Sequence, residues 1–178
     1  MKMEQIDAVL REAKKLGSVQ DIYFEGGEPF LVYSLLKEGV RSARRMGFSV
    51  GIVTNGFWAK DEEEATHWLE PLAQLGISDL SISDDELHYV NLSHCPSIIA
   101  LDAALKLGMP ARALRCFRPE VNPDAVSAEN GGLPYSGGVS LRGRAVKSFA
   151  SELPKRDPTF FLECPHEDLE VPKRVTST

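Results

Sequence analysis

A glycine pair followed by an acid and a proline is the stretch of this sequence best suited to bind a ligand. The stretch follows the apolar residues 22–24, which are typical of a buried strand, and consists of Gly26, Gly27, Glu28 and Pro29. The glycines allow a ligand to approach the backbone closely, and Pro29 stands where a first helical turn begins. A helix N-terminus normally favours an anion, but the Glu28 carboxylate repels one, so we expect a cation such as an amino-acid α-ammonium group. The same residues are also typical of a tight strand-to-helix turn in which Glu28 supports the helix dipole.

A second polar segment, residues 81–88, begins inside another apolar run. Ser81 and Ser83 share one face of a strand because side chains alternate, and hydroxyls on that face could hydrogen-bond a ribose or a carboxylate. Asp84 and His88 have the types and spacing of an acid–base pair, and with the acids between them they could also hold a hard metal ion. No second ligand cluster occurs elsewhere in the sequence, so we expect no metal site. A solvated acidic loop with a helix cap is the remaining alternative.

Three further polar residues follow other apolar runs. Asn55 is a candidate pocket residue, but Asn55 and Gly56 together are also typical of a simple turn, because both residue types tolerate left-handed backbone. Arg115 and Arg118 could neutralise a carboxylate, although an arginine near a strand end is also typical of a solvated edge charge. The substrate-binding candidates are therefore Asp84, His88 and Arg115.

Apolar periodicity places these residues on a repeating β/α pattern. Four glycines end apolar segments just before β-rich runs, 30, 29 and 32 residues apart: Gly17, Gly47, Gly76 and Gly108. This spacing is that of a strand together with its helix. We expect strands at 19–24, 48–53, 79–83, 111–117 and 139–146. We expect helices at 6–16, 31–46, 61–75 and 97–107, with Pro71 kinking the helix at 61–75 or splitting it at Glu70.

The pattern predicts an α/β fold with a parallel sheet and crossover helices. We expect a partial TIM-like barrel whose first strand is missing, because the helix at 6–16 has no strand ahead of it. In such folds ligands bind at the carboxyl ends of the strands, and every polar segment above follows a strand. We assign residues 1–153 to this barrel, with 119–138 as a long loop or lid. Residues 154–178 are rich in proline and charge and are predicted to be a tail without regular structure.

Composition excludes several classes of protein. The chain has 178 residues, 43% of them hydrophobic and 26% charged, and a net charge of −6, which predicts a soluble globular protein and disfavours nucleic-acid binding. It has no run of eighteen apolar residues and no signal peptide, so we expect a cytoplasmic protein with no membrane association. The three cysteines, Cys95, Cys116 and Cys164, are odd in number and far apart, which argues against a disulfide framework.

The glycine–acid–proline turn after a hydrophobic strand resembles the GGEP motif of the radical S-adenosylmethionine enzymes, in which it contacts the amino group of the cofactor's methionine half. The turn at Asn55 and the Ser-x-Ser strand end followed by a histidine are similar to further, looser features of that family. The resemblance covers residues 4–146. It implies S-adenosylmethionine as cofactor, bound by Gly26, Gly27, Glu28, Pro29, Asn55, Ser81 and Ser83.

One defining feature of that family does not occur in this sequence. Its chemistry requires a CxxxCxxC loop that holds a 4Fe-4S cluster, and the cysteines here are 21 and 48 residues apart. In the family this loop lies between the first strand and the first helix, and this chain begins at that helix. We therefore expect the sequence upstream of Met1 to encode a strand and the three cysteines.

Two hypotheses follow for the function of the chain. In the favoured one it is a radical S-adenosylmethionine protein or a fragment of one, able to form a 5′-deoxyadenosyl radical and abstract hydrogen from an unknown small-molecule or peptide substrate once a cluster loop is present. In the other it is a non-catalytic β/α module that binds an amino acid, a nucleotide or a partner protein. In either case we expect self-association through the unpaired sheet edge at residues 19–24.

Overall fold

The computed structural model describes residues 1–85, 95–121, 135–136 and 144–153. Contacts divide the chain into two units, one made of Met1–Arg118 with Gly137–Val139 and the other of Pro119–Ser136 with Ser140–Thr178. In the described residues, no helix is long and apolar enough to span a membrane.

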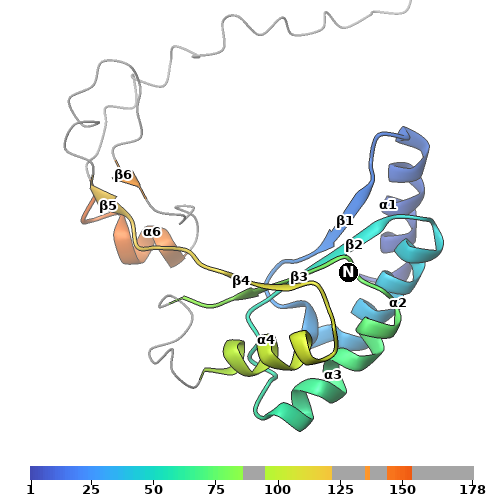
Figure 1. Cartoon of the computed structure of the whole chain (residues 1–178). Coiled ribbons are helices and arrows are strands. Elements are labelled where there is room, and N and C mark those ends of the chain that lie inside the picture. The colour runs from blue at the N-terminus through green and yellow to red at the C-terminus, as the bar shows by residue number, and fades with distance from the viewer. Residues whose placement is uncertain (86–94, 122–134, 137–143, 154–178) are drawn as a thin grey trace, which may run out of the picture. The chain divides into compact units, whose positions relative to one another are not determined.

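The first unit is a four-stranded parallel sheet whose strands alternate with helices (Figure 1). The elements are α1 (Met3–Leu16), β1 (Asp21–Phe24), the 3-10 helix η1 (Pro29–Val32), α2 (Tyr33–Arg45), β2 (Ser49–Thr54), α3 (Glu62–Gln74), β3 (Asp79–Ser83), α4 (Pro96–Lys106) and β4 (Ala111–Leu114). The strands lie in the order β1-β2-β3-β4, so each neighbours the next in sequence and each connection is a crossover helix. The predicted α/β fold with parallel strands is therefore confirmed.

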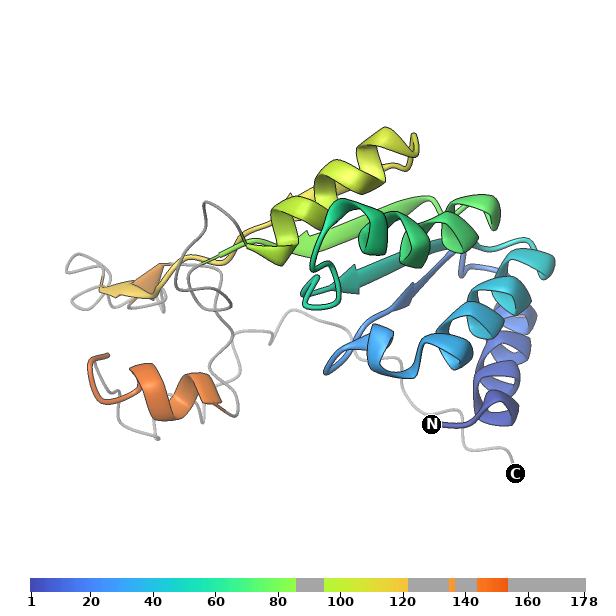
Figure 2. The same cartoon turned by 90° about the horizontal axis from the view of Figure 1, so that it is seen from below.

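The hydrophobic core lies between the helices and one face of the sheet (Figure 2). The two central strands contribute Val50, Ile52, Leu80 and Ile82, each with 0% of its surface exposed. Burial of each such side chain stabilises the fold by about 1.5–3 kcal/mol relative to leaving it in water. The helices cover these side chains with apolar residues at three- and four-residue spacing, such as Ile6 and Leu10 of α1 and Leu69 and Leu72 of α3.

The opposite face of the sheet carries the alternate residues of each strand. The parallel register places Tyr23 beside Gly51, Val53 beside Ser81, and Ser81 beside Arg112. The Tyr23 ring covers Gly51 so closely that a Cβ atom at position 51 would lie 2.2 Å from it. The centre of this face therefore carries Gly51, Val53 and Ser81, a less uniformly apolar set than Val50, Ile52, Leu80 and Ile82 on the helix-covered face.

Pro71 does not split α3 at Glu70, so one of the two outcomes predicted for it is wrong, while a kink at Pro71 stays a prediction. The helix runs without a break from Glu62 to Gln74. Leu69 and Leu72, on either side of the proline, are both 0% exposed in the core, and their burial favours a continuous helix. The proline costs one backbone hydrogen bond, but its carbonyl partner belongs to His67 on the exposed side of α3, where water can replace the lost donor.

Several predicted boundaries shift, and one predicted strand is wrong in part. β1 begins at Asp21 rather than at residue 19, and β4 ends at Leu114 rather than at residue 117. The expected fifth strand at 139–146 overlaps the second unit's helix α6 (Arg144–Phe149), so residues 144–146 are helical, and 139–143 lie outside the described residues. Helical backbone there follows from the apolar spacing of Val146 and Phe149, which are three residues apart.

The remaining described part of the second unit is a short antiparallel pair. β5 (Glu120–Val121) pairs with β6 (Tyr135–Ser136), with Val121 opposite Tyr135. The stretch predicted as a long loop at 119–138 thus contains two strand pieces, which its proline and glycine content concealed. The predicted tail at 154–178 lies outside the described residues, and the assignment of 1–153 to one barrel stays a prediction.

Candidate functional site

The Gly26-Gly27 turn leaves the carboxyl end of β1 with its backbone open to solvent. Gly26 has φ +127°, in the region that favours glycine, and no heavy atom lies within 4 Å of the position that a Cβ would take at either glycine. Both residues are exposed, as is Glu25 before them. A ligand can therefore reach the peptide groups of this turn without displacing a side chain of the described residues.

The Glu28 side chain turns back from this loop toward the end of β2. Its Oε1 accepts hydrogen bonds from the Phe30 backbone N–H at 3.1 Å and from Thr54 Oγ1 at 2.8 Å, and its Oε2 accepts one from the Asn55 backbone N–H at 2.8 Å. A carboxylate has about four lone-pair positions, so about one remains, on Oε2. Glu28 therefore joins two strand-end turns and also caps η1, which begins at Pro29.

Thr54 and Trp58 complete this arrangement and were not predicted as site residues. Thr54 Oγ1 accepts from the Gly56 backbone N–H at 3.1 Å and from Trp58 Nε1 at 3.0 Å while it donates to Glu28. Trp58 stacks on Phe30, with ring centroids 4.3 Å apart and 13° between the planes. A threonine at a strand end that is followed by Asn-Gly was the available sequence signal, because a buried hydroxyl must find partners.

Asn55 forms the turn that the sequence predicted for it and Gly56. Its side-chain Oδ1 accepts from the Phe57 backbone N–H at 3.0 Å, as in an Asx turn, and Gly56 has φ +73°. An added Cβ at Gly56 would lie 3.1 Å from the Ser97 Cα, so this turn packs directly on the start of α4. The assignment of Asn55 to a ligand pocket stays a prediction.

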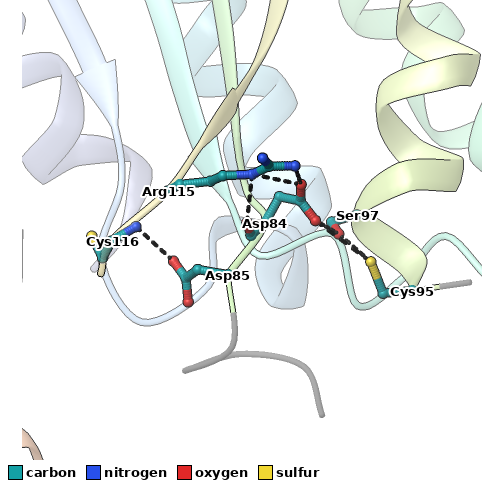
Figure 3. A network of polar contacts seen from close by, with 6 residues as sticks. All are labelled: Asp84, Asp85, Cys95, Ser97, Arg115 and Cys116. Atoms are coloured by element: carbon teal, nitrogen blue, oxygen red, sulfur yellow. Dashed lines mark hydrogen bonds and ion pairs between the residues drawn. The ribbon is translucent and has the colours of Figure 1, made fainter. Parts of the chain in front are cut away.

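A second polar group surrounds Asp84, at the carboxyl end of β3 (Figure 3). Its Oδ2 accepts from Arg115 Nη2 at 2.6 Å and Nε at 3.1 Å, and the Arg115 Nε also donates to the Asp84 carbonyl at 3.2 Å. Its Oδ1 accepts from Ser97 Oγ at 3.0 Å and from Cys95 Sγ at 3.6 Å. Asp84 therefore connects the end of β4 to the first residues of α4.

The surroundings of Asp84 favour its charged form. Asp84 is only 4% exposed, and this burial alone would raise the pKa of its carboxyl, but the hydrogen bonds and charge of Arg115, with the Ser97 and Cys95 hydrogen bonds, hold the pKa below its ordinary value. The Arg115 side chain remains 59% exposed, so this ion pair connects a buried carboxylate to a guanidinium group at the surface. The predicted acid–base partner of Asp84, His88, lies outside the described residues.

Asp85 and the two serines extend the rim on either side. Asp85, 4% exposed, accepts from the Cys116 backbone N–H at 3.1 Å and so ties the segment after β3 to the segment after β4. Ser81 donates to Asp79 Oδ2 at 2.9 Å, and is thereby directed toward the amino end of β3. Ser83 shares the Ser81 face one step nearer the carboxyl end and is 9% exposed.

The described residues contain no group of three His, Cys, Asp or Glu side chains placed to hold a metal ion. Figure 3 shows Cys95 and Cys116 on opposite sides of Asp84 and Asp85. Cys164 lies outside the described residues. The structure thus brings together Glu28 with Asn55 and Asp84 with Arg115, all at the carboxyl edge of the sheet.

No protein-family model matches the chain, but it is similar to several curated proteins, two of which are as follows. A Bacillus subtilis (strain 168) protein named "Putative peptide biosynthesis protein YydG" is 32% identical over 88 residues, 49% of this chain and 28% of that protein. The "Tungsten-containing aldehyde ferredoxin oxidoreductase cofactor-modifying protein" of Pyrococcus furiosus is 30% identical over 123 residues, 66% of this chain and 33% of that protein. The chain is a distant homologue of both. It spans about a third or less of the length of each.

Proposed function

We propose that this chain is the S-adenosylmethionine-binding β/α part of a radical S-adenosylmethionine protein. The observation that carries the proposal is the Glu28 carboxylate, which fixes the GGEP turn against the Thr54-Asn55-Gly56 turn at the carboxyl edge of a parallel sheet. Ligands of parallel α/β sheets bind at that edge. The distant homology to a peptide biosynthesis protein and a cofactor-modifying protein supports the same proposal.

In this proposal the amino-acid half of the cofactor lies over the open glycine backbone. Carbonyl groups of Gly26 and Gly27 accept from the α-ammonium group, and the lone-pair position left on Glu28 Oε2 faces the same cation. Ser83 supplies a hydroxyl for the ribose or the carboxylate. Arg115 is held by Asp84 through Nε and Nη2, which leaves its Nη1 group to donate to a carboxylate of the cofactor or the substrate.

The cysteines of the described residues do not fit a 4Fe-4S cluster. Cys95 lies against Asp84 and Ser97, Cys116 stands apart from it, and three thiolates are needed. We therefore propose cofactor binding for this chain. Hydrogen abstraction is proposed only for a protein in which a CxxxCxxC loop is also present, with a peptide or a cofactor as substrate class in view of the two relatives' names.

Isothermal titration of the purified chain with S-adenosylmethionine and with S-adenosylhomocysteine tests the proposal. We expect weak, saturable binding of both, reduced about tenfold or more by Glu28→Ala, because that change removes one ligand contact and releases the turn. Glu12→Ala, on the exposed face of α1, is the matched control and should bind as the unaltered chain does. Absence of heat for both ligands with the unaltered chain would overturn the proposal.

The alternative is a binding module without redox chemistry, and it is favoured by the spacing of the three cysteines, which lie 21 and 48 residues apart and form no CxxxCxxC loop. Iron and sulfide content after anaerobic reconstitution separates the two hypotheses when it is measured on a longer form of the protein that includes the sequence upstream of Met1. A module without a cluster should retain no stoichiometric iron, yet it should still bind an amino acid or a nucleotide. Retention of near-equal iron and sulfide would require ligands beyond the described residues and would favour the radical enzyme.

A further inference from the structure

We infer that Thr54 is a positioning residue that sets the Gly26-Gly27 turn for its ligand by locking the Glu28 carboxylate. The part of this inference that concerns a ligand rests on the proposed function. The lock itself, which is the hydrogen bond by which Thr54 holds the Glu28 carboxylate, is a property of the fold. Thr54 is 2% exposed and belongs to β2, not to the glycine turn, so its effect on a ligand is transmitted through Glu28.

The direction of the Thr54 hydroxyl is fixed by its neighbours. A hydroxyl has one proton and two lone pairs. Two N–H groups, from Gly56 at 3.1 Å and from Trp58 at 3.0 Å, occupy the lone pairs. Only the proton is left, and Glu28 Oε1 at 2.8 Å accepts it. Thr54 therefore acts toward Glu28 as a donor in a single orientation.

The lock forms a closed circuit of four side chains and one backbone group. Glu28 accepts from Thr54, Thr54 accepts from Trp58, Trp58 stacks on Phe30, and the Phe30 N–H donates back to Glu28. Trp58 is 3% exposed and Phe30 2%, so the aromatic part of the circuit has little freedom to move. A Tyr33 and Trp68 edge-to-face pair, with centroids 4.7 Å apart, packs beside Phe30 and supports it.

The glycine turn needs such a lock because the described residues do not hold it by packing. No atom comes within 4 Å of the Cβ position at Gly26 or Gly27, and glycine has the largest backbone freedom of any residue. The contacts of Glu28, the next residue, therefore decide where the two peptide groups point. Glu28 therefore serves mainly to hold the turn in place, since about three of its lone-pair positions already accept hydrogen bonds from within the chain.

The first test of the lock is amide hydrogen exchange, measured by NMR on the full chain. Thr54→Val removes the hydroxyl at nearly constant volume and should lower the protection of the Phe30 and Asn55 amides about ten- to a hundredfold, because both donate to Glu28. Thr54→Ser keeps the hydroxyl and should restore most of that protection. Protection of the Ile82 amide in β3 should be equal in all three chains.

The second test is ligand affinity, measured with S-adenosylhomocysteine as the probe. Thr54→Val should weaken binding about tenfold and Thr54→Ser should restore it, a rescue that general destabilisation would not produce. Thr66→Val is the matched control, because the Thr66 hydroxyl bonds only the Glu62 carbonyl one turn earlier in α3 among the described residues. Trp58→Phe, which keeps the ring stacking but removes the N–H, gives a further variant with a smaller expected loss.

These outcomes separate the lock from the proposed function. If Thr54→Val loses amide protection while the unaltered chain binds no S-adenosylhomocysteine, the lock stands and the proposed ligand is wrong. If Thr54→Val folds and keeps both its amide protection and its affinity, the lock is wrong. Should Thr54→Val fail to fold, unchanged Phe30 and Asn55 protection in Trp58→Phe would overturn the lock instead.

Discussion

Gly56 lies so close to the backbone of Ser97 that it has no room for a side chain, and this close approach joins the two polar groups of the site. A Cβ at Gly56 would lie 3.1 Å from the Ser97 Cα and 3.4 Å from its N. The Gly56 N–H donates to Thr54, which donates to Glu28, while the Ser97 hydroxyl donates to Asp84, which pairs with Arg115. A continuous path of contacts therefore runs across the ends of all four strands.

The close approach predicts that Gly56→Ala is more damaging than an ordinary glycine substitution. Gly56 has φ +73°, and Gly17 at the end of α1 has nearly the same value, φ +72°, with no atom within 4 Å of its Cβ position. Gly17→Ala should therefore cost about 1 kcal/mol from the backbone alone, and Gly56→Ala about 2–4 kcal/mol because of the added clash. Urea unfolding of both variants measures the difference. Equal losses would show that the backbone of Ser97 moves aside without penalty.

We predict that the stability of the folded chain depends on pH through the Asp84 carboxyl, and that this dependence relies on Arg115. Because the pKa of Asp84 is lower in the folded chain than in the unfolded one, its contribution is fully present above the unfolded value of about 3.9 and is lost as pH falls through the folded pKa. In Arg115→Gln, burial of Asp84 should raise that pKa, while Ser97 and Cys95 compensate only in part. Because the folded pKa then moves toward the unfolded one or above it, Arg115→Gln should lose less stability on acidification than the unaltered chain does.

NMR titration of the Asp84 carboxyl carbon in both chains gives the direct measurement. The midpoint should lie at higher pH in Arg115→Gln than in the unaltered chain. Arg112→Gln is the matched control, since Arg112 pairs with Asp79 at the other end of β3 and should leave the Asp84 midpoint unchanged. A shift of similar size in both variants would mean that general charge, not the close pair, sets the pKa of Asp84.

Much of the fold could be read from the sequence because it depends on short-range patterns. Apolar spacing and the glycine stops located α1 to α4, and the ends of β3 were predicted to the residue. The polar residues that follow each predicted strand likewise indicated one shared edge of the sheet for Glu28, Asn55, Asp84 and Arg115. These signals are local, so each segment carries them by itself.

The contacts within the site depend on register and side-chain direction, which the sequence pattern does not encode. Glu28 was expected to face a cation, whereas its carboxylate points mainly at Thr54 and the Asn55 N–H. Cys95 and Ser97, which follow Asp84 by 11 and 13 residues in the chain, reach it only because α4 begins beside the end of β3. Such partners become visible only once the strands are paired and the crossover helices are in place.

We predict that copies of this chain associate through the edge of β1 that does not face β2. The strand pairs with β2 on one side, and the described residues place no strand on its other side. An edge of unpaired N–H and C=O groups favours pairing with another chain, so sedimentation should show species larger than a monomer as concentration rises. Tyr23→Lys, which puts a charge at this 48% exposed edge position, should shift the distribution toward monomer. A clean monomer of the unaltered chain at high concentration would contradict the prediction.

Glu28→Gln should destabilise the chain although it preserves the shape of the side chain. The glutamine oxygen can still accept from Thr54 and the Phe30 N–H, but its NH2 group would then meet the Asn55 N–H, and two donors would face each other across the position where Oε2 now accepts at 2.8 Å. Hydrogen bonds to a charged acceptor contribute about 1.5–3 kcal/mol, so we expect a loss of about that size in urea unfolding. Glu25→Gln, three residues earlier on the exposed part of the same turn, should change stability by less than about 0.5 kcal/mol. Equal stability of Glu28→Gln and Glu25→Gln would show that the turn adapts to an amide and that the charge of Glu28 serves only the ligand.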